Sequence, residues 1–336
     1  MTMLPTHESS MGHPHVLVYL VTSDSADLTL VSSNLASEVS AEITGVFQLA
    51  DLPLVTILAH TESQVDPRIL QSCDALVVAL DGSSGVGAKT IEVWNQARDL
   101  TLPRHVLAFN VVHGRADFDE LCAIASRTME PDLLVRYLPI DSDDELSLTG
   151  VYDILTSEIH ALVDSKWITQ SADPEHIALT SSAREDLFEQ LAYLGLDDAA
   201  LKNHQDGLPI SVTRLESAWS HPDLVAVTPI DDGVGAVIFR TWLTLLTPVW
   251  IPTQVSNDFT VDVTDTSEFI GLAITETIAR IWGNQTDQEI GCKQSDVWQP
   301  LSDLAICGAL LRSQNLIPGK TICNQASSSV LVTPVL

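Results

Sequence analysis

Apolar positions along this chain fall into short unbroken runs, separated by stretches in which apolar residues recur every three or four positions. An unbroken apolar run of this kind is typical of a strand buried on both faces of a parallel sheet. The runs predict strands over residues 15–22, 54–59, 75–80, 105–110 and 224–228, with a short strand at 136–140. The recurring pattern predicts helices over residues 28–39, 91–100, 116–129, 150–163, 183–194, 199–204, 212–220 and 235–246.

Residues 74–110 show this alternation in its clearest form. Gly82, Gly85 and Gly87 form a tight polar turn directly after the run at 75–80. The helical spacing that follows ends at Pro103, before the next apolar run. A strand, a turn, a helix and a second strand make up the basic unit of an α/β fold, so we predict an α/β protein with a mostly parallel sheet.

The pattern changes toward the C-terminal part of the sequence. Pro248 and Pro252 mark a boundary, and from residue 257 onward the apolar runs become short and rich in β-branched residues. We therefore expect a flexible tail at residues 1–14, an α/β domain at 15–252, and a small β-barrel at 257–336.

Charge narrows the classes of partner. The 45 acidic and 16 basic residues give a net charge of −29, which repels phosphate backbones and anionic membranes. We therefore expect a protein partner, with no independent nucleic-acid binding and no membrane. The five scattered cysteines have no metal-site spacing, and residues 1–15 lack the apolar core of a signal peptide. These features predict reduced thiols in a cytoplasmic protein.

Several motifs occur in a fixed order. Residues 74–98 read DALVVALDGSSGVGAKTIEVWNQAR, with Val93, Trp94, Gln96 and Ala97 near the end. This stretch resembles the core of the G domain of bacterial elongation factor G, the ribosomal translocation GTPase. Further segments similar to that family cover almost the whole chain: GRADFDEL at 114–121, LPIDSDDELSLTGVYDIL at 138–155, LLTPVWIP at 245–252 and LIPGKTICN at 316–324.

The resemblance implies a P-loop-GTPase-like sheet with a helical insert at about residues 139–222, followed by a barrel similar to domain II of that family. It also implies the ribosome or a translation factor as the partner. The three C-terminal translocation domains of the family have no counterpart in the sequence, which stops at Leu336.

The phosphate-binding motif of the family departs from its pattern here. Asp24 and Thr29 remain in register with it, but the family's Lys is Asp27 and its Mg²⁺-binding Thr is Leu28. In a working P-loop the Lys and backbone N–H groups hold the phosphates. Asp27 therefore puts a negative charge where the family places a positive one.

The other nucleotide motifs are also altered. The guanine-reading motif keeps Asn110, but its Asp is replaced by His113. The turn that orients the attacking water is replaced by a polar segment containing His60, three positions out of register and most simply a loop histidine. The segment corresponding to the first switch loop is short.

Three hypotheses follow from these departures. The first is a pseudo-GTPase without cofactor, catalytic residue or metal, which acts by binding protein. The second is a divergent GTPase that still binds GTP and Mg²⁺, with Lys89 or Arg115 supplying the missing positive charge. The third is a repurposed domain without a role in translation.

Overall fold

The computed structural model describes most of the chain's core elements. The residues that it describes are 16–23, 38–39, 45–49, 52–141, 148–163, 166–193, 202, 206, 219, 224–230, 234–246, 270–275, 277–282, 290–294, 297–307, 309–314, 316, 318 and 320–324. The predicted tail at 1–14 and most of the predicted helices at 28–39, 199–204 and 212–220 lie outside these residues; Glu38 and Val39 form the short strand β2.

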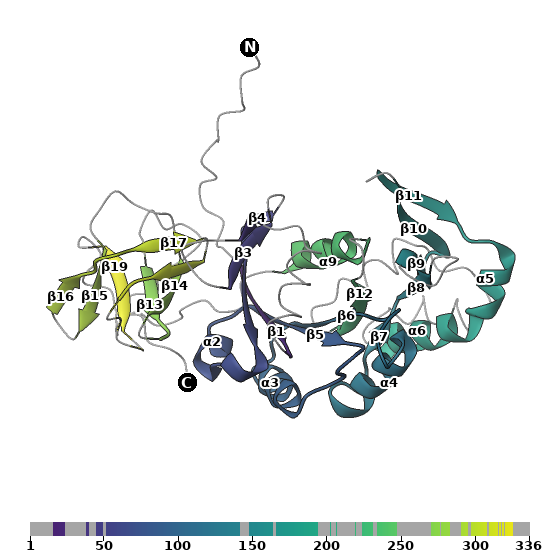
Figure 1. Ribbon diagram of the computed structural model, residues 1–336, viewed down its shortest axis with the longest axis horizontal. Coiled ribbons are helices and arrows are strands. Elements are labelled where there is room, and N and C mark those ends of the chain that lie inside the picture. The colour runs from purple at the N-terminus through teal and green to yellow at the C-terminus, as the bar shows by residue number, and fades with distance from the viewer. Residues whose placement is uncertain are drawn as a thin grey trace, which may run out of the picture. The chain divides into compact units, whose positions relative to one another are not determined.

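An eight-stranded sheet forms the centre of the fold, in the order β2-β3-β4-β1-β5-β6-β12-β7 (Figure 1). The strands after β2 are β3 (Val46–Leu49), β4 (Leu52–Thr61), β1 (Val16–Thr22), β5 (Ala75–Asp81), β6 (Arg104–Phe109), β12 (Ala226–Pro229) and β7 (Leu134–Val135). The pairs from β1 through β5, β6 and β12 to β7 are all parallel. Every residue of β1 and β5 is buried, as the unbroken apolar runs predict.

Helices lie on both faces of this sheet. In Figure 1, α9 (Val234–Leu245) lies above the sheet, and α2 (Pro67–Gln71), α3 (Ala88–Asp99) and α4 (Phe118–Thr128) lie below it. Asp66 and Asp117 begin α2 and α4 as N-caps, each accepting a hydrogen bond from a backbone N–H group of the first turn. The mixed α/β fold with a mostly parallel central sheet is confirmed.

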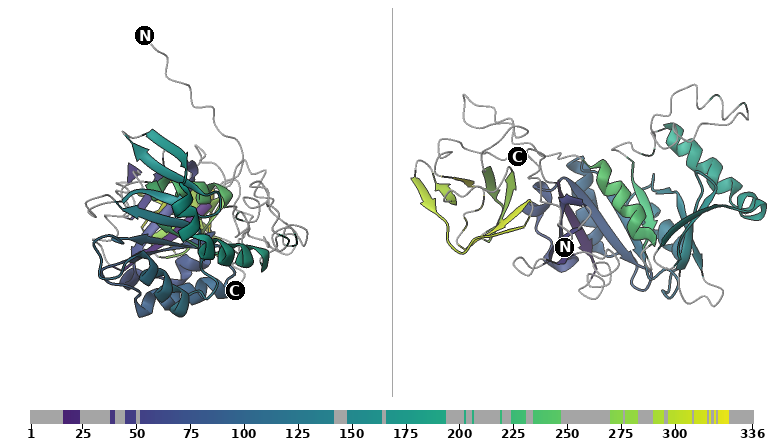
Figure 2. Two further views of the ribbon diagram at one scale, coloured as in Figure 1. Left: turned by 90° about the vertical axis from the view of Figure 1, so that its right-hand side faces the viewer. Right: turned by 90° about the horizontal axis from the view of Figure 1, so that it is seen from above.

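A second, antiparallel sheet follows in the region of the expected insert. Its order is β11-β10-β9-β8, with bounds β8 (Tyr137–Asp141), β9 (Leu148–Asp153), β10 (Glu158–Val163) and β11 (Lys166–Ser171). The helices α5 (Pro174–Leu179) and α6 (Ser181–Tyr193) come after it. Figure 2 shows this sheet and its two helices beside the β12 and β7 side of the central sheet.

The predicted helix at residues 150–163 is therefore wrong, because these residues form β9, a turn and β10. Asp153 makes the turn: its carboxylate accepts hydrogen bonds from the backbone N–H groups of Leu155 and Thr156, at 2.9 and 3.4 Å. Ser157 then adopts a left-handed backbone conformation (φ 58°), which interrupts any helix. The predicted helix at 183–194 is confirmed by α6.

The C-terminal strands form a seven-stranded sheet in the order β16-β15-β19-β13-β14-β18-β17. The bounds are β13 (Ile270–Ala273), β14 (Ile278–Trp282), β15 (Ile290–Gln294), β16 (Val297–Pro300), β17 (Ala305–Cys307), β18 (Leu310–Arg312) and β19 (Thr321–Asn324). The described pairings between these strands are antiparallel, and Ile281, Leu311 and Ile322 belong to the buried core that they share.

Contacts divide the chain into two compact units that are both discontinuous in sequence. One unit contains Val18–Glu38 and Ile57–Thr247. The other contains Met1–Leu17, Val39–Thr56 and Pro248–Leu336. Strand β4 contributes residues to both units. None of the described helices is long and apolar enough to cross a membrane.

Candidate functional site

The carboxyl ends of β1, β5 and β6 meet at one edge of the central sheet. Ligands of open α/β sheets bind outside this edge, so a nucleotide site is expected there. Ser23 follows β1, Asp81 ends β5, and Asn110 follows β6. Of the predicted site residues, Asn110 and His113 are described, whereas Asp24, Asp27 and Thr29 lie outside the described part of the chain.

Asn110 links the loops that follow β5 and β6. Its backbone is left-handed (φ 56°), a conformation that Asn adopts more readily than most residues. Its side-chain Nδ2 donates a hydrogen bond to Asp81 Oδ1 at 3.1 Å, and the same oxygen accepts one from the backbone N–H of Ser83 at 2.8 Å. The Asn110 side chain therefore contacts a protein carboxylate, which supports the interpretation of Asn110 as a turn residue.

Two glycines allow these loops to approach closely. A Cβ atom on Gly82 would lie 2.6 Å from the backbone oxygen of Asn110, and one on Gly114 would lie 2.5 Å from the same oxygen. The Gly82 carbonyl accepts hydrogen bonds from the backbone N–H groups of Arg115 and Ala116, both at 2.9 Å. Backbone therefore packs against backbone at the position where the family has its guanine-reading loop.

The positively charged residues considered for a rescued site are on the surface. Lys89 Nζ donates to Glu92 Oε2 at 2.8 Å on the exposed side of α3, and this contact raises the pKa of Lys89. Arg115 and His113 are exposed in the loop after β6. A phosphate-sized cavity at residues 23–28 would favour the divergent GTPase; of these residues the structure describes only Ser23, whose Oγ is 3.4 Å from Ser84 Oγ.

His60 is bound to a buried tyrosine. Its Nδ1 lies 3.1 Å from the Tyr19 hydroxyl, and the two rings meet edge to face with centroids 5.6 Å apart. The Tyr19 hydroxyl also accepts a hydrogen bond from the Asp66 backbone N–H at 3.4 Å. Burial lowers the pKa of His60 and raises that of Tyr19, so both groups are neutral near pH 7. These contacts support a structural role for His60.

The amino end of α3 is occupied by a carboxylate of the protein itself. Thr90 Oγ1 donates to Glu62 Oε2 at 3.0 Å, and a Cβ atom on Gly87, the N-cap residue, would lie 2.3 Å from Glu62 Oε2. A helix N-terminus attracts negative charge. Glu62 therefore fills a position that an anionic ligand would otherwise prefer.

Sequence reasoning missed a buried ion pair. Arg136 donates through Nε and Nη2 to the two carboxylate oxygens of Asp153, at 3.0 and 2.7 Å. Burial alone would raise the pKa of Asp153, but hydrogen bonds from His160 and Arg136 and the Arg136 charge lower it to about 2. A lone Asp among the apolar residues of 150–155 was the signal that could have revealed it. Among the described residues, no group of three side chains is placed to hold a metal ion.

Comparisons with known proteins give partial matches. No family model matches the chain. The chain is 28% identical to "Ribosome-releasing factor 2, mitochondrial" of Drosophila ananassae over 134 residues, which cover 38% of this chain and 18% of that protein. The same protein of Drosophila sechellia also matches at 28% identity, with 19% of its length covered. The chain therefore matches only about a fifth of the length of these relatives.

A solved structure extends the similarity to the fold of nearly the whole chain. The crystal structure of a protein from Thermus thermophilus superposes with a TM-score of 0.65, at 16% sequence identity, over 96% of this chain and 56% of that chain. The sequence match shows partial similarity to a protein named for ribosome release, and the structural match shows a shared fold.

Proposed function

We propose that this chain is a pseudo-GTPase that acts by binding a protein of the translation apparatus. In this proposal it keeps a GTPase-like fold but neither binds nor hydrolyses GTP. The observation that carries the proposal is Asp27, which stands where the related GTPases have the phosphate-binding Lys.

The size of the charge effect supports a loss of nucleotide binding. Two unit charges about 4 Å apart interact by about 4 kcal/mol at an effective dielectric constant near 20, so reversing one charge costs roughly twice that. A micromolar complex has a total binding free energy of about 8 kcal/mol. The reversal at Asp27 is therefore comparable to the whole binding free energy of an ordinary nucleotide complex.

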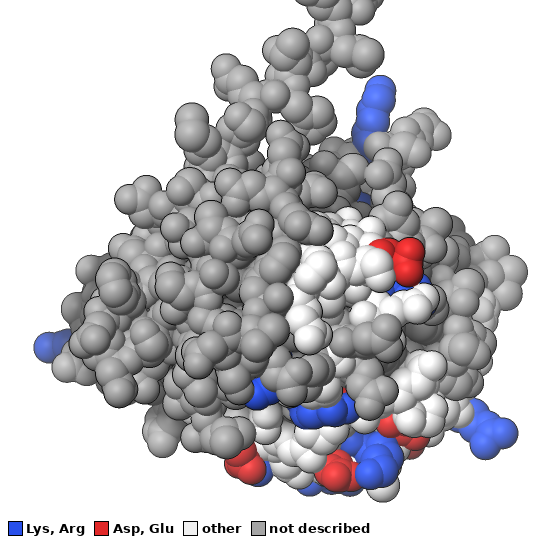
Figure 3. All heavy atoms as spheres, turned by 90° about the vertical axis from the view of Figure 1, so that its left-hand side faces the viewer, with Lys and Arg blue, Asp and Glu red and all other residues white. Residues whose placement is uncertain are grey.

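The described part of the candidate edge is consistent with this proposal. Asn110 donates to Asp81, His113 is exposed, and Glu62 lies at the amino end of α3. In the view of Figure 3, several of the described Lys and Arg side chains at the lower edge lie next to Asp and Glu side chains. These features favour contact with protein over contact with phosphate groups.

The choice of partner rests on the named relatives. Their name assigns them to ribosome release, and the net charge of −29 opposes binding to bare RNA. We therefore propose a ribosomal protein or a translation factor as the partner. A cytoplasmic location remains a prediction, since the names of both relatives say mitochondrial.

Calorimetric titration with GTP and with GDP, each with Mg²⁺, tests the loss of nucleotide binding. We expect no saturable heat from the wild-type chain. Micromolar binding would overturn the pseudo-GTPase proposal and favour the divergent GTPase.

A restored variant tests whether Asp27 is responsible. The triple change Ala26→Gly, Asp27→Lys and Leu28→Thr returns the family's residues, and we expect it to gain measurable GDP binding. Asp132→Lys changes net charge equally at an exposed turn and serves as the control, with no gain expected. If the restored variant stays silent, the charge argument is wrong and the other departures account for the loss.

Co-sedimentation with purified ribosomal subunits tests the partner. We expect the chain to travel with a subunit in a sucrose gradient, without added nucleotide. A chain that stays at the top of the gradient, with both subunits and with cell extract present, would leave the repurposed domain as the better description.

A further inference from the structure

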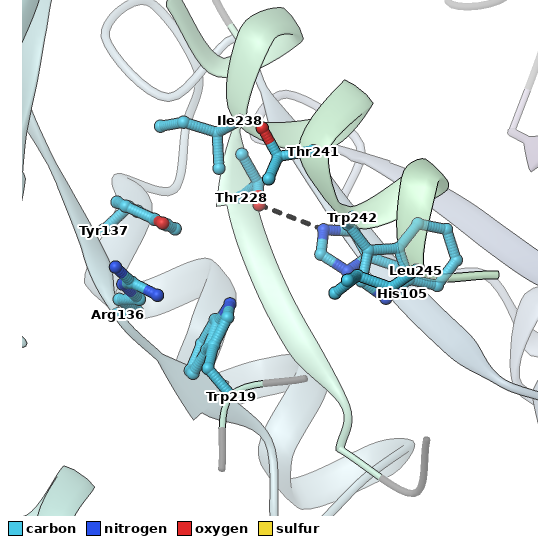
Figure 4. Close-up of a pocket in the computed structure, with 9 residues that line it drawn as sticks. All are labelled: His105, Arg136, Tyr137, Trp219, Thr228, Ile238, Thr241, Trp242 and Leu245. Atoms are coloured by element: carbon cyan, nitrogen blue, oxygen red, sulfur yellow. Dashed lines mark hydrogen bonds between the residues drawn. The ribbon is translucent and has the colours of Figure 1, made fainter. Parts of the chain in front are cut away.

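A cavity of about 90 Å³ lies within the unit that contains residues 57–247, away from the candidate nucleotide edge (Figure 4). It is lined by His105, Arg136, Tyr137, Trp219, Thr228, Ile238, Thr241, Trp242 and Leu245. These residues come from β6, β8 and its preceding residue, β12, α9 and the isolated position 219. His105 lies five positions before Asn110, which corresponds to about 16 Å at a strand rise of about 3.3 Å per residue.

The lining carries no uncompensated charge. The guanidinium of Arg136 is paired with the buried carboxylate of Asp153 through two hydrogen bonds. Burial lowers the pKa of His105 to about 3, so its imidazole is neutral near pH 7. A charged ligand would lose its hydration without gaining an opposite charge, so the cavity favours a neutral ligand.

Flat groups dominate the walls. The His105 and Trp242 rings lie with centroids 4.6 Å apart and planes at 36°. Across the cavity, the Arg136 guanidinium lies 4.9 Å from the Tyr137 ring centroid and 5.1 Å from that of Trp219. Aromatic faces and a guanidinium plane stack well on another planar group. The walls are therefore suited to a planar ligand.

One polar atom of a lining residue is buried and has no partner among the residues that the structure describes. His105 Nε2 is hydrogen-bonded to Thr228 Oγ1 at 3.0 Å, whereas His105 Nδ1 is buried with no partner among the described residues. Leaving a buried polar atom unsatisfied is unfavourable, so a ligand that reaches this nitrogen gains by supplying the missing hydrogen bond.

The volume limits the ligand to one ring. A cavity of about 150 Å³ holds benzene, and this one is smaller, so fused two-ring systems do not fit. Leu245 is 42% exposed, which shows that the lining extends to the surface and gives a route of entry. We propose that this cavity binds a small, uncharged aromatic ring with a hydrogen-bonding nitrogen or hydroxyl, of the azole or phenol class.

Titration with pyrazole, followed by NMR of the tryptophan indole N–H groups in the full chain, tests this site. Pyrazole is planar, neutral near pH 7, and carries a donor beside an acceptor. We expect saturable shifts of the Trp219 and Trp242 signals, assigned with Trp219→Phe and Trp242→Phe, and a dissociation constant in the millimolar range. Benzoate, which is charged, should give none. Unmoved Trp219 and Trp242 signals up to the solubility limit of pyrazole would overturn the proposal.

Two threonines of α9 give a matched pair of variants. Both are exposed and both donate a side-chain hydrogen bond to a carbonyl of the preceding turn, but only Thr241 lines the cavity. We expect Thr241→Phe to fill the cavity and weaken pyrazole binding by at least about tenfold, and Thr244→Phe to leave it unchanged. Equal affinities in the two variants would place pyrazole elsewhere and contradict the site.

His105→Phe tests the polar contact separately. Because phenylalanine keeps a flat ring but has no nitrogen, this variant should lose its preference for pyrazole over benzene, which has no hydrogen-bonding group. A variant that still prefers pyrazole by the wild-type ratio would show that His105 does not select the ligand.

Discussion

The strand–helix unit of β5, α3 and β6 and the loops at its carboxyl edge are stabilised in different ways. In the unit, apolar side chains fill the interior: all of β5 is buried and Trp94 is 0% exposed. In the loops, glycine backbone and the Asn110 amide make the contacts. A substitution in the strand–helix unit changes side-chain packing, whereas a side chain placed at Gly82 or Gly114 in the loops would meet backbone atoms. The difference teaches that apolar side chains stabilise the sheet while close backbone contacts shape its carboxyl edge.

Trp94 and Arg104 of this unit share a polar partner. The Glu130 carboxylate accepts a hydrogen bond from Trp94 Nε1 at 3.3 Å and forms an ion pair with Arg104. The Arg104 guanidinium lies 5.1 Å from the centroid of the Trp94 ring. Trp94 therefore stabilises the core through its volume, its N–H group and its face.

The largest expected effect is in this core. Trp94→Ala should lower the free energy of unfolding by about 3–5 kcal/mol, because it leaves a cavity and removes a partner of Glu130. Urea denaturation followed by circular dichroism measures the change. Trp167→Ala is the control, since Trp167 is 40% exposed and its loss should cost less than about 1 kcal/mol. Equal losses in the two variants would contradict the contrast between core and surface.

The next largest effect is the loss of stability at low pH caused by His105, a buried polar residue of β6. Burial lowers the pKa of His105 from 6.5 to about 3, so the unfolded chain takes up the proton first as the pH falls. The contribution of His105 to the free energy of unfolding is therefore fully present above pH 6.5 and is lost between pH 6.5 and 3. About 2 kcal/mol of it is lost by pH 5.

Urea denaturation at pH 7 and at pH 5 measures this loss. His105→Phe should reduce it by the share of His105 and leave that of His60, whose pKa burial also lowers, while His113→Asn, at an exposed loop position, should leave the loss unchanged. A His105→Phe chain that is destabilised by acid as much as the wild type would show that other groups account for the loss.

The smallest expected change in the free energy of unfolding is at Asn110, at the carboxyl edge of the central sheet. Asn110→Ala should cost about 1–2 kcal/mol, because alanine is strained at φ 56° and the hydrogen bond to Asp81 is lost. Asn110→Gly loses the same hydrogen bond without that strain, so it should cost less. Urea denaturation of both variants separates the cost of backbone strain from the cost of the lost hydrogen bond. If Asn110→Gly is destabilised as much as Asn110→Ala, the whole effect comes from the lost hydrogen bond.

Local signals explain which parts of the fold sequence could predict. The burial of β5 follows from an apolar run without interruption, and the end of α3 follows from Pro103. Residues 150–163 were misread because their apolar spacing fits a helix as well as two strands, and the turn at Asp153 and Ser157 decided between them. Asp153 and Ser157 are residue types that favour a turn, but the helical spacing of the apolar residues suggested a helix.

The candidate site was less accessible to prediction. The departures at Asp27 and His113 can be read directly, but the bond from Asn110 to Asp81 joins residues 29 positions apart and depends on a left-handed backbone. The cavity depends on His105 and Trp242, which meet only because β6 and α9 pack together. No local pattern marks either residue as part of a cavity.

Strand β4 has a consequence for the order of folding. Thr56, in its first half, accepts a hydrogen bond from the Ala309 backbone N–H at 2.9 Å, across 253 positions of sequence. At a synthesis rate of about 5–20 residues per second, the two residues emerge roughly 13–50 s apart. The second half of β4 belongs to the unit that is complete at Thr247, so one strand completes its contacts in two stages. The hydrogen bond between Thr56 and Ala309 can therefore form only after that interval.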